Sequence, residues 1–83
     1  MQFFVYILYS NILDQYYTGQ TSDLADRLFR HNNSGSKSTK KAKDWICVYT
    51  ESFETRSEAV HRENEIKAKR NRKYIEELIN KKS

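Results

Sequence analysis

Residues 3–9 read FFVYILY. This stretch is short, rich in β-branched and aromatic side chains and followed by polar residues, which is typical of a buried strand. A second, weaker strand is expected at residues 16–20 (YYTGQ), because residues 11–15 are few enough for a hairpin connection. A third strand is expected at residues 45–53 (WICVYTESF), which are apolar at first and alternate near their end.

The segment between the second and third strands begins with a helical pattern. Thr21 and Ser22 offer an N-terminal cap, and Leu24, Leu28 and His31 recur at helical spacing before the sequence NNSG ends the helix. The polar, cationic residues 34–44 that follow are expected to form a loop.

Two more helices are expected after the third strand. Residues 55–58 (TRSE) fit the capping-box pattern and predict a helix over residues 56–70. Asn71 can cap a last helix, whose apolar stripe contains Tyr74, Ile75, Leu78 and Ile79. The predicted class is therefore α/β (α+β), with a small three-stranded antiparallel sheet flanked by helices in the order β-β-α-β-α-α.

Length and composition limit what this fold can do. The 83 residues predict a single domain over residues 1–83, with room for one small core. Eleven aromatic residues argue against a disordered segment, and the one cysteine, Cys47, excludes an internal disulfide and an all-cysteine metal site. Residues 3–9 are too short to span a membrane and lack the features of a signal peptide, so a soluble cytoplasmic protein without a membrane partner is expected.

Positive charge is concentrated in the second part of the chain. Residues 1–36 carry two basic and three acidic groups, whereas residues 37–83 carry thirteen basic and eight acidic groups. The basic residues form two clusters, Lys37, Lys40, Lys41 and Lys43 and then Lys67, Lys69, Arg70, Arg72 and Lys73. Such clusters fit a polyanion such as nucleic acid, and solvated surface is the alternative.

One acidic residue breaks the pattern of the second helix. At helical spacing, Glu63 projects among the inward residues Ala59, Val60 and Ile66. A carboxylate among apolar neighbours needs a compensating cation or hydrogen bonds. An ion pair with Lys67, four residues on, is one explanation, and a metal-binding or catalytic role is the other.

The first helix and the paired strands offer further candidates. Arg27 and His31 share a face that borders the apolar stripe, where an arginine either meets an anion or packs its stem, and a histidine either compensates the helix dipole or takes part in catalysis. Strand side chains alternate, so only one of Tyr16 and Tyr17 can share a face with Tyr6. Packing alone is an alternative role for these tyrosines.

Together these residues resemble a known family. Phe4-Val5-Tyr6, Tyr17-Thr18-Gly19, Arg27 with His31-Asn32, and Glu63-Asn64-Glu65-Ile66-Lys67 are similar to the blocks of the GIY-YIG nucleases, and especially of their small, stand-alone single-domain members. The resemblance extends from about residue 3 to residue 78 and keeps the order and spacing of all four blocks. Two positions depart from the family pattern: Phe4 replaces its first glycine, and Thr18 stands at the middle of its second triplet.

The resemblance implies metal-dependent hydrolysis of nucleic-acid phosphodiesters. Glu63 would bind a divalent cation, Mg²⁺ or Mn²⁺, which needs only one or two carboxylates when water completes its shell. Arg27 would contact the scissile phosphate and stabilise the transition state. Tyr6 would accept a proton from the attacking water or orient it, with Tyr17 beside it, and Lys67 and His31 would assist.

The resemblance also implies partners and an alternative function. Phosphate or nucleic-acid contacts are expected from Gly19, Lys37, Lys40, Lys41, Lys43, Lys67, Lys69 and Arg70. DNA is favoured over RNA, with structure-biased cleavage linked to DNA repair or recombination, and specificity would come from substrate shape, a protein partner or a homodimer. The alternative is a non-catalytic nucleic-acid-binding module that retains the nuclease fold.

Overall fold

The computed structural model describes residues 2–33 and 42–82. Its elements are β1 (Phe3–Ser10), β2 (Gln15–Thr21), α1 (Leu24–Asn33), β3 (Ile46–Phe53), α2 (Arg56–Lys69) and α3 (Arg72–Lys82). The predicted order β-β-α-β-α-α is confirmed, and the ends of the strands and of α2 lie within one residue of the predicted ends. The loop predicted at residues 34–44 falls mostly outside the described residues.

The central strand of the sheet is β1. The strand order is β2-β1-β3 and both pairings are antiparallel, so Tyr6 lies opposite Gly19 on one side and Thr50 on the other. The register between β1 and β3 shifts between Ile7 and Leu8. Because β1 is covered on both faces, its apolar residues form a continuous run rather than an alternating pattern.

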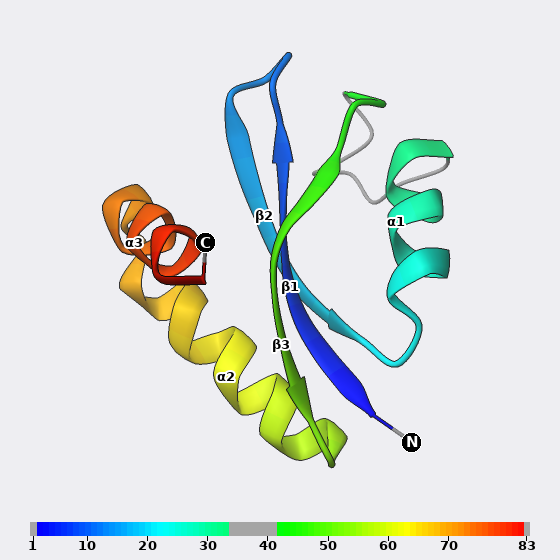
Figure 1. Ribbon diagram of the computed structural model, residues 1–83, viewed down its shortest axis with the longest axis vertical. Coiled ribbons are helices and arrows are strands. Elements are labelled where there is room, and N and C mark those ends of the chain that lie inside the picture. The colour runs from blue at the N-terminus through cyan, green and yellow to red at the C-terminus, as the bar shows by residue number, and fades with distance from the viewer. Residues whose placement is uncertain (1, 34–41, 83) are drawn as a thin grey trace.

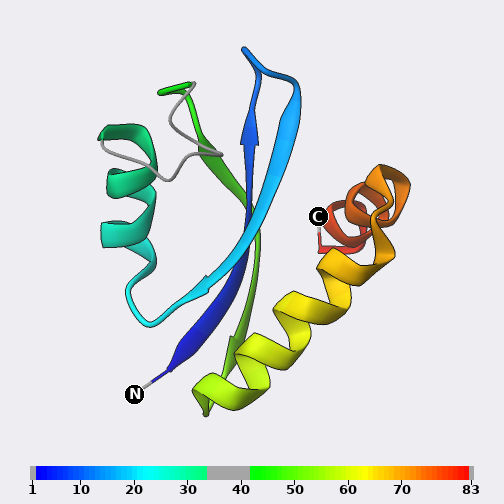
Figure 2. The same cartoon turned by 180° about the vertical axis from the view of Figure 1, so that it is seen from behind.

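Helices cover both faces of the sheet (Figures 1 and 2). On the α1 face, Tyr6, Leu8 and Trp45 form a buried cluster against which Leu24 and Leu28 of α1 pack. On the opposite face, which α2 and α3 cover, a second cluster is formed by Val5, Ala59 and Ile66 with Phe3, Phe53, Tyr74, Ile75 and Leu78 around it. The two faces of one small sheet therefore carry separate cores.

The cap of α1 differs from the prediction. Asp23, rather than Thr21 or Ser22, caps the helix, and its Oδ1 accepts a hydrogen bond from the backbone N–H of Asp26 at 3.0 Å. Thr21 is buried at the end of β2, where its hydroxyl accepts from the backbone N–H of Asp23 at 3.1 Å. The Thr21 side chain is therefore used to turn the chain toward the helix.

The boundaries of α2 and α3 follow the predicted capping residues. The hydroxyl of Thr55 accepts from the backbone N–H of Glu58 at 3.2 Å, as the capping box predicts. Arg70 ends α2 in a left-handed conformation with φ of 46°, and Asn71 then accepts from the backbone N–H of Lys73 at 2.9 Å. The two helices are thus joined by a sharp turn.

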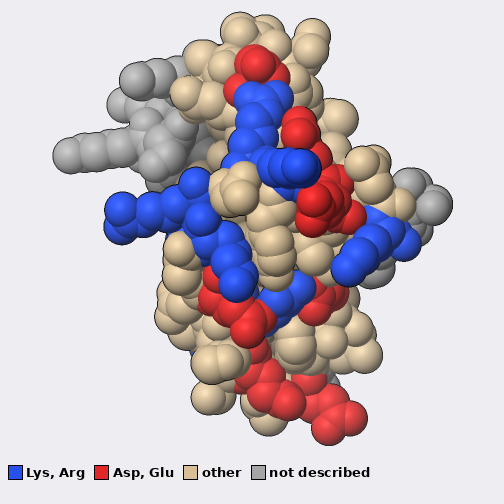
Figure 3. Space-filling model, turned by 90° about the vertical axis from the view of Figure 1, so that its left-hand side faces the viewer, with Lys and Arg blue, Asp and Glu red and all other residues tan. Residues whose placement is uncertain are grey.

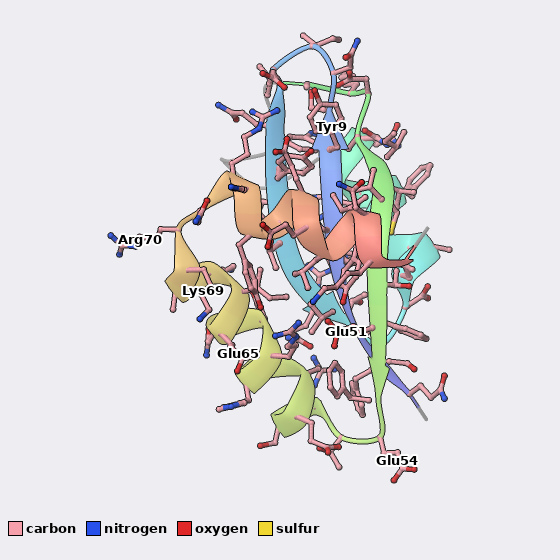
Figure 4. All side chains as sticks on the ribbon, turned by 60° about the vertical axis from the view of Figure 1, so that its left-hand side comes forward. Tyr9, Glu51, Glu54, Glu65, Lys69 and Arg70 are labelled. Carbon is pink, nitrogen blue, oxygen red and sulfur yellow. The ribbon has the colours of Figure 1, made fainter. Side chains whose placement is uncertain are left out.

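A charged network fixes α2 against β3 and α3. The guanidinium of Arg62 donates to Glu51 of β3 at 3.0 Å, to Glu65 on its own helix, and to the hydroxyl of Tyr74 of α3 at 3.3 Å. Tyr49 also donates to Glu51. In Figure 4 the Glu51 side chain extends from β3 toward the helices. Arg62 precedes Glu63, so the network also limits how α2 can turn about its axis.

Candidate active site

A hydrogen bond between Tyr6 and His31 lies at the centre of the site. The Tyr6 hydroxyl is 2.9 Å from Nε2 of His31, and the two residues are 2% and 5% exposed. Burial raises the pKa of Tyr6 well above its ordinary value, and Tyr17 raises it further. Burial and the charge of Arg27 lower the pKa of His31. We therefore assign the donor to the Tyr6 hydroxyl and the acceptor to a neutral imidazole.

Tyr17 connects this pair to α2. Its ring centroid lies 6.5 Å from that of Tyr6 and 4.8 Å from that of His31. On its other side, the Lys67 ammonium lies 6.0 Å from the same ring. Of Tyr16 and Tyr17, it is thus Tyr17 whose side chain lies on the same face of the sheet as that of Tyr6.

Gly19 leaves room for the ring of Tyr6. A Cβ atom at this position would lie 2.5 Å from the Tyr6 hydroxyl oxygen and 2.7 Å from its Cζ, which is too close for any side chain. Gly19 is itself buried. Its small size is explained by packing against Tyr6, and the nucleic-acid contact expected from sequence stays a prediction.

Arg27 is exposed on α1, and its positive charge acts on the pKa of both Tyr6 and His31. Against the larger effects of burial and Tyr17, its positive charge lowers the pKa of Tyr6. It forms no ion pair with another residue in the described ranges 2–33 and 42–82. Its guanidinium is therefore available to an anion that approaches Tyr6 from solvent.

Glu63 forms the ion pair that the spacing predicted. Its Oε2 lies 2.6 Å from Nζ of Lys67, and the side chains of Glu63 and Lys67 are 15% and 49% exposed. The negative charge of Glu63 also acts on Tyr6, whose pKa it raises after the larger effects of burial and Tyr17. The ion pair does not remove Glu63 from the tyrosine site, because Lys67 itself contacts Tyr17.

Glu63 fits only a metal ion that needs few ligands from the protein. In the part of the chain that the structure describes, no three His, Cys, Asp or Glu side chains converge on one point. A cation that demands a full set of protein ligands therefore does not fit. One partly buried carboxylate does fit Mg²⁺ or Mn²⁺ with water and phosphate oxygens as the other ligands, although such an ion would share Glu63 with Lys67.

The predicted phosphate-binding residues are less uniform than their sequence clusters. Lys37, Lys40 and Lys41 lie outside the described residues, and Lys43 is exposed. Lys69 lies 5.6 Å from the ring of Tyr74, and Lys67 is neutralised by its ion pair. Figure 3 shows that basic and acidic side chains are interleaved on the side of the molecule where α2 and α3 lie. Arg70 is exposed and extends into solvent in Figure 4.

A comparison with protein-family models identifies a family that matches most of the chain. The model of the GIY-YIG catalytic domain matches residues 2–75. The chain belongs to the GIY-YIG family. GIY-YIG domains are nuclease domains that act on nucleic acid and generally depend on a divalent metal ion.

Relatives of this GIY-YIG chain are small proteins. A UPF0213 protein of Staphylococcus epidermidis is 45% identical over 65 residues, which cover 77% of this chain and 78% of the relative. A UPF0213 protein of Staphylococcus saprophyticus is 48% identical over 52 residues, or 61% of this chain and 63% of the relative, so the match spans less than two thirds of that protein.

A solved structure resembles this GIY-YIG fold. The solution NMR structure of a UPF0213 protein from Bacillus halodurans has 32% sequence identity and a TM-score of 0.60 and covers 96% of this chain and 84% of the other chain. It supports the arrangement of three antiparallel strands and three helices. None of the helices in the described ranges has the length and apolarity that a membrane span requires.

Two supporting residues of this GIY-YIG site were not singled out for the site from sequence. The side chain of Asn32 accepts from the backbone N–H of Trp45 at 2.8 Å and donates to its carbonyl at 3.0 Å, which ties the end of α1 to the start of β3. Its position directly after His31 was the available signal. Arg62 was the second, and its partners on other elements leave no local pattern in the sequence.

Proposed function

We propose that this chain is a divalent-metal-dependent nuclease that hydrolyses phosphodiester bonds with Tyr6, Tyr17, Arg27, His31 and Glu63. The observation that carries the proposal is that the buried hydroxyl of Tyr6 is hydrogen-bonded to His31 and lies within the electrostatic influence of both Arg27 and Glu63. Family membership supports the reaction class. The favoured substrate is DNA with a branch or an end, in a repair or recombination setting.

In the proposed reaction, Tyr6 and His31 move one proton. A water molecule attacks the phosphorus atom and gives its proton to the Tyr6 oxygen, while the Tyr6 hydroxyl proton passes to Nε2 of His31. This relay suits a tyrosine with a raised pKa, because the phenol is never required to persist as an anion. The P–O bond to the leaving oxygen then breaks, and this oxygen takes a proton from solvent.

The charged residues stabilise the transition state. Arg27 donates to the phosphoryl oxygens, where negative charge accumulates. The metal ion, held by Glu63, would polarise the phosphate and stabilise the leaving oxygen when bound. Tyr17 packs beside Tyr6 and orients its ring, and Lys67 offers a second cation to the phosphate once it is released from Glu63.

The test is a cleavage assay on end-labelled single strands, blunt duplexes, flaps and four-way junctions, with Mg²⁺, Mn²⁺ or EDTA. Glu63→Gln and Arg27→Ala are each expected to lose at least about 100-fold in single-turnover rate. Glu63→Gln is expected to retain most of its binding, because it removes no positive charge.

Two matched variants control for indirect effects. Arg30→Ala removes an exposed arginine on the same helix that pairs with Asp26 at 2.9 Å. Glu54→Gln removes an acid that points away from the molecule in Figure 4. Both are expected to cleave normally, and an equal loss in controls and site variants would contradict the proposal, as would cleavage that persists in EDTA.

The alternative proposal is a non-catalytic binding module. Its support is the 2.6 Å ion pair, which neutralises Glu63 without any metal ion. It predicts binding that needs no divalent ion and no cleavage of any substrate under any of the tested conditions.

A further inference from the structure

We propose that a groove along the outer edge of β2 binds an unpaired nucleic-acid arm next to the reacting phosphate. The inference rests on the proposed nuclease function and narrows its substrate class to nucleic acid with a single-stranded segment. The groove has a volume of about 540 Å³ and lies between β2 and the turn that joins α2 to α3. That size suits a ligand comparable to one nucleotide.

The groove is continuous with the candidate active site. Tyr17 and Lys67 line it and also belong to the cluster around Tyr6. A strand whose phosphate lies near Arg27 and Tyr6 can therefore continue past Tyr17 into the groove. Glu63 remains beside this path through its ion pair with Lys67.

The lining of the groove combines aromatic and cationic groups. Tyr16 is partly exposed there, and the guanidinium carbon of Arg72 lies 5.2 Å from its ring centroid. The lining carries the cations Lys67, Arg70 and Arg72 and the acid Asp14. Lys67 pairs with Glu63, and Arg72 pairs with Asp14 and Glu76. Arg70 forms no ion pair with any residue that the structure describes. Stacking surfaces beside backbone-neutralising cations are how proteins hold single strands.

A single strand is favoured over other occupants. A duplex does not fit a groove of about 540 Å³, whereas one unstacked base does. Among the described residues β2 pairs with β1 alone, so its free edge also invites a peptide strand. The unpaired Arg70 beside the rings of Tyr16 and Tyr17 favours a nucleic-acid strand, because a phosphate can pair with the arginine while a base stacks on a ring.

The first experiment locates the arm by photocrosslinking. A junction with a short single-stranded arm carries one 5-iododeoxyuridine, moved stepwise along the arm, and is bound to the Glu63→Gln variant. Mass spectrometry is expected to find the crosslink on Tyr16 or Tyr17 from one or two adjacent arm positions. Crosslinks confined to residues outside the groove would overturn the inference.

The second experiment compares affinities for an armed duplex and a blunt duplex. Tyr16→Ala is expected to weaken binding of the armed substrate by about 5- to 100-fold, with blunt-duplex binding unchanged. Tyr16→Phe retains the ring and is expected to bind normally. Arg70→Asn, which tolerates the left-handed backbone, is expected to reduce the salt dependence of arm binding by about one ion, whereas Lys81→Gln leaves it unchanged.

The outcomes separate the two proposals. Selective arm binding without cleavage would support the groove and overturn the nuclease proposal. If the unmodified protein cleaves and Tyr16→Ala binds armed and blunt substrates with unchanged affinity, the nuclease proposal is supported and the proposal that the groove binds the arm is overturned. An equal loss for both substrates, or capture of a peptide instead of the arm, would also overturn the groove.

Discussion

The hydroxyl of Tyr6 and Nε2 of His31 lie 2.9 Å apart although the residues are 25 positions apart in the sequence. The contact joins the central strand β1 to the last turn of α1 and buries both polar groups. Buried polar groups are retained when each satisfies the other, and here the positive charge of the exposed Arg27 acts on both members of the pair.

Removal of the Tyr6 hydroxyl tests this pair directly. Tyr6→Phe is expected to reduce the single-turnover cleavage rate by about 10²- to 10⁴-fold, since it removes the group that is proposed to accept the water proton. It also removes the buried hydrogen bond between Tyr6 and His31, so urea unfolding is expected to show a loss of about 1 kcal/mol. A variant that cleaves at the normal rate would exclude Tyr6 from the reaction. Tyr74→Phe, on the other face, serves as a matched control.

The acid limb of the pH–rate profile is expected below pH 6.5. His31 must be neutral to accept the proton, and burial together with Arg27 lowers its pKa from the ordinary value of about 6.5. Activity is therefore retained as the pH falls through 6.5 and is lost at a lower pH. Measurement of kcat/KM from pH 4.5 to 8 locates this acid limb. In His31→Gln the remaining activity should no longer show the limb. A limb above pH 6.5 would contradict the assignment.

Gly19→Ala is expected to damage both stability and activity. The new Cβ would meet the Tyr6 side chain at 2.5 Å, and the strand backbone cannot move away without breaking the register of β1 and β2. The expected cost is about 1–3 kcal/mol in denaturant unfolding, with a fall in cleavage rate. In a Tyr6→Val background the same change should cost much less, and equal costs in the two backgrounds would refute this explanation.

The protein is expected to lose stability at alkaline pH. Burial and the bond to Glu51 raise the pKa of Tyr49 to about 12, and burial raises that of Tyr6 as well. Both phenols are thus protonated in the folded protein at pH values where unfolded tyrosine ionises, near pH 10. The contribution of Tyr49 is complete below pH 10 and is lost between pH 10 and 12, whereas that of Tyr6 is lost at higher pH. Urea midpoints at pH 8 and 10.5 should differ less in Tyr49→Phe than in the unmodified protein.

Lys67→Met is expected to strengthen metal binding. The ammonium of Lys67 competes with a cation for Glu63, and the substitution keeps an apolar stem while it removes the charge. Mn²⁺ binding without nucleic acid, measured by electron paramagnetic resonance, should become tighter, and Lys69→Met should leave it unchanged. Unchanged or weaker binding in Lys67→Met would show that Glu63 is not the metal ligand.

Local patterns were sufficient for most of the fold. The run at residues 3–9 and the capping box at Thr55 each depend on neighbours within a few residues, and the structure has both. The cap of α1 was predicted wrongly, because the choice between Thr21 and Asp23 depends on the direction in which the chain leaves β2. Sequence spacing does not contain that direction.

The candidate site was only partly accessible from sequence. The ion pair of Glu63 and Lys67 follows from helical spacing and is confirmed. The Arg62–Glu51 contact and the position of Tyr17 between two helices depend on how separate elements pack, which no single segment specifies. The catalytic roles themselves remain predictions.

His31 of α1 contacts Tyr17 on one side and Lys67 of α2 contacts it on the other. No single segment of the chain therefore contains the whole candidate site. The hairpin of β1 and β2 holds both tyrosines, yet the histidine arrives only with α1 and the acid only with α2. Under the proposed function, an incomplete or partly unfolded chain is thus expected not to cleave nucleic acid, and cleavage would report completed folding of the molecule.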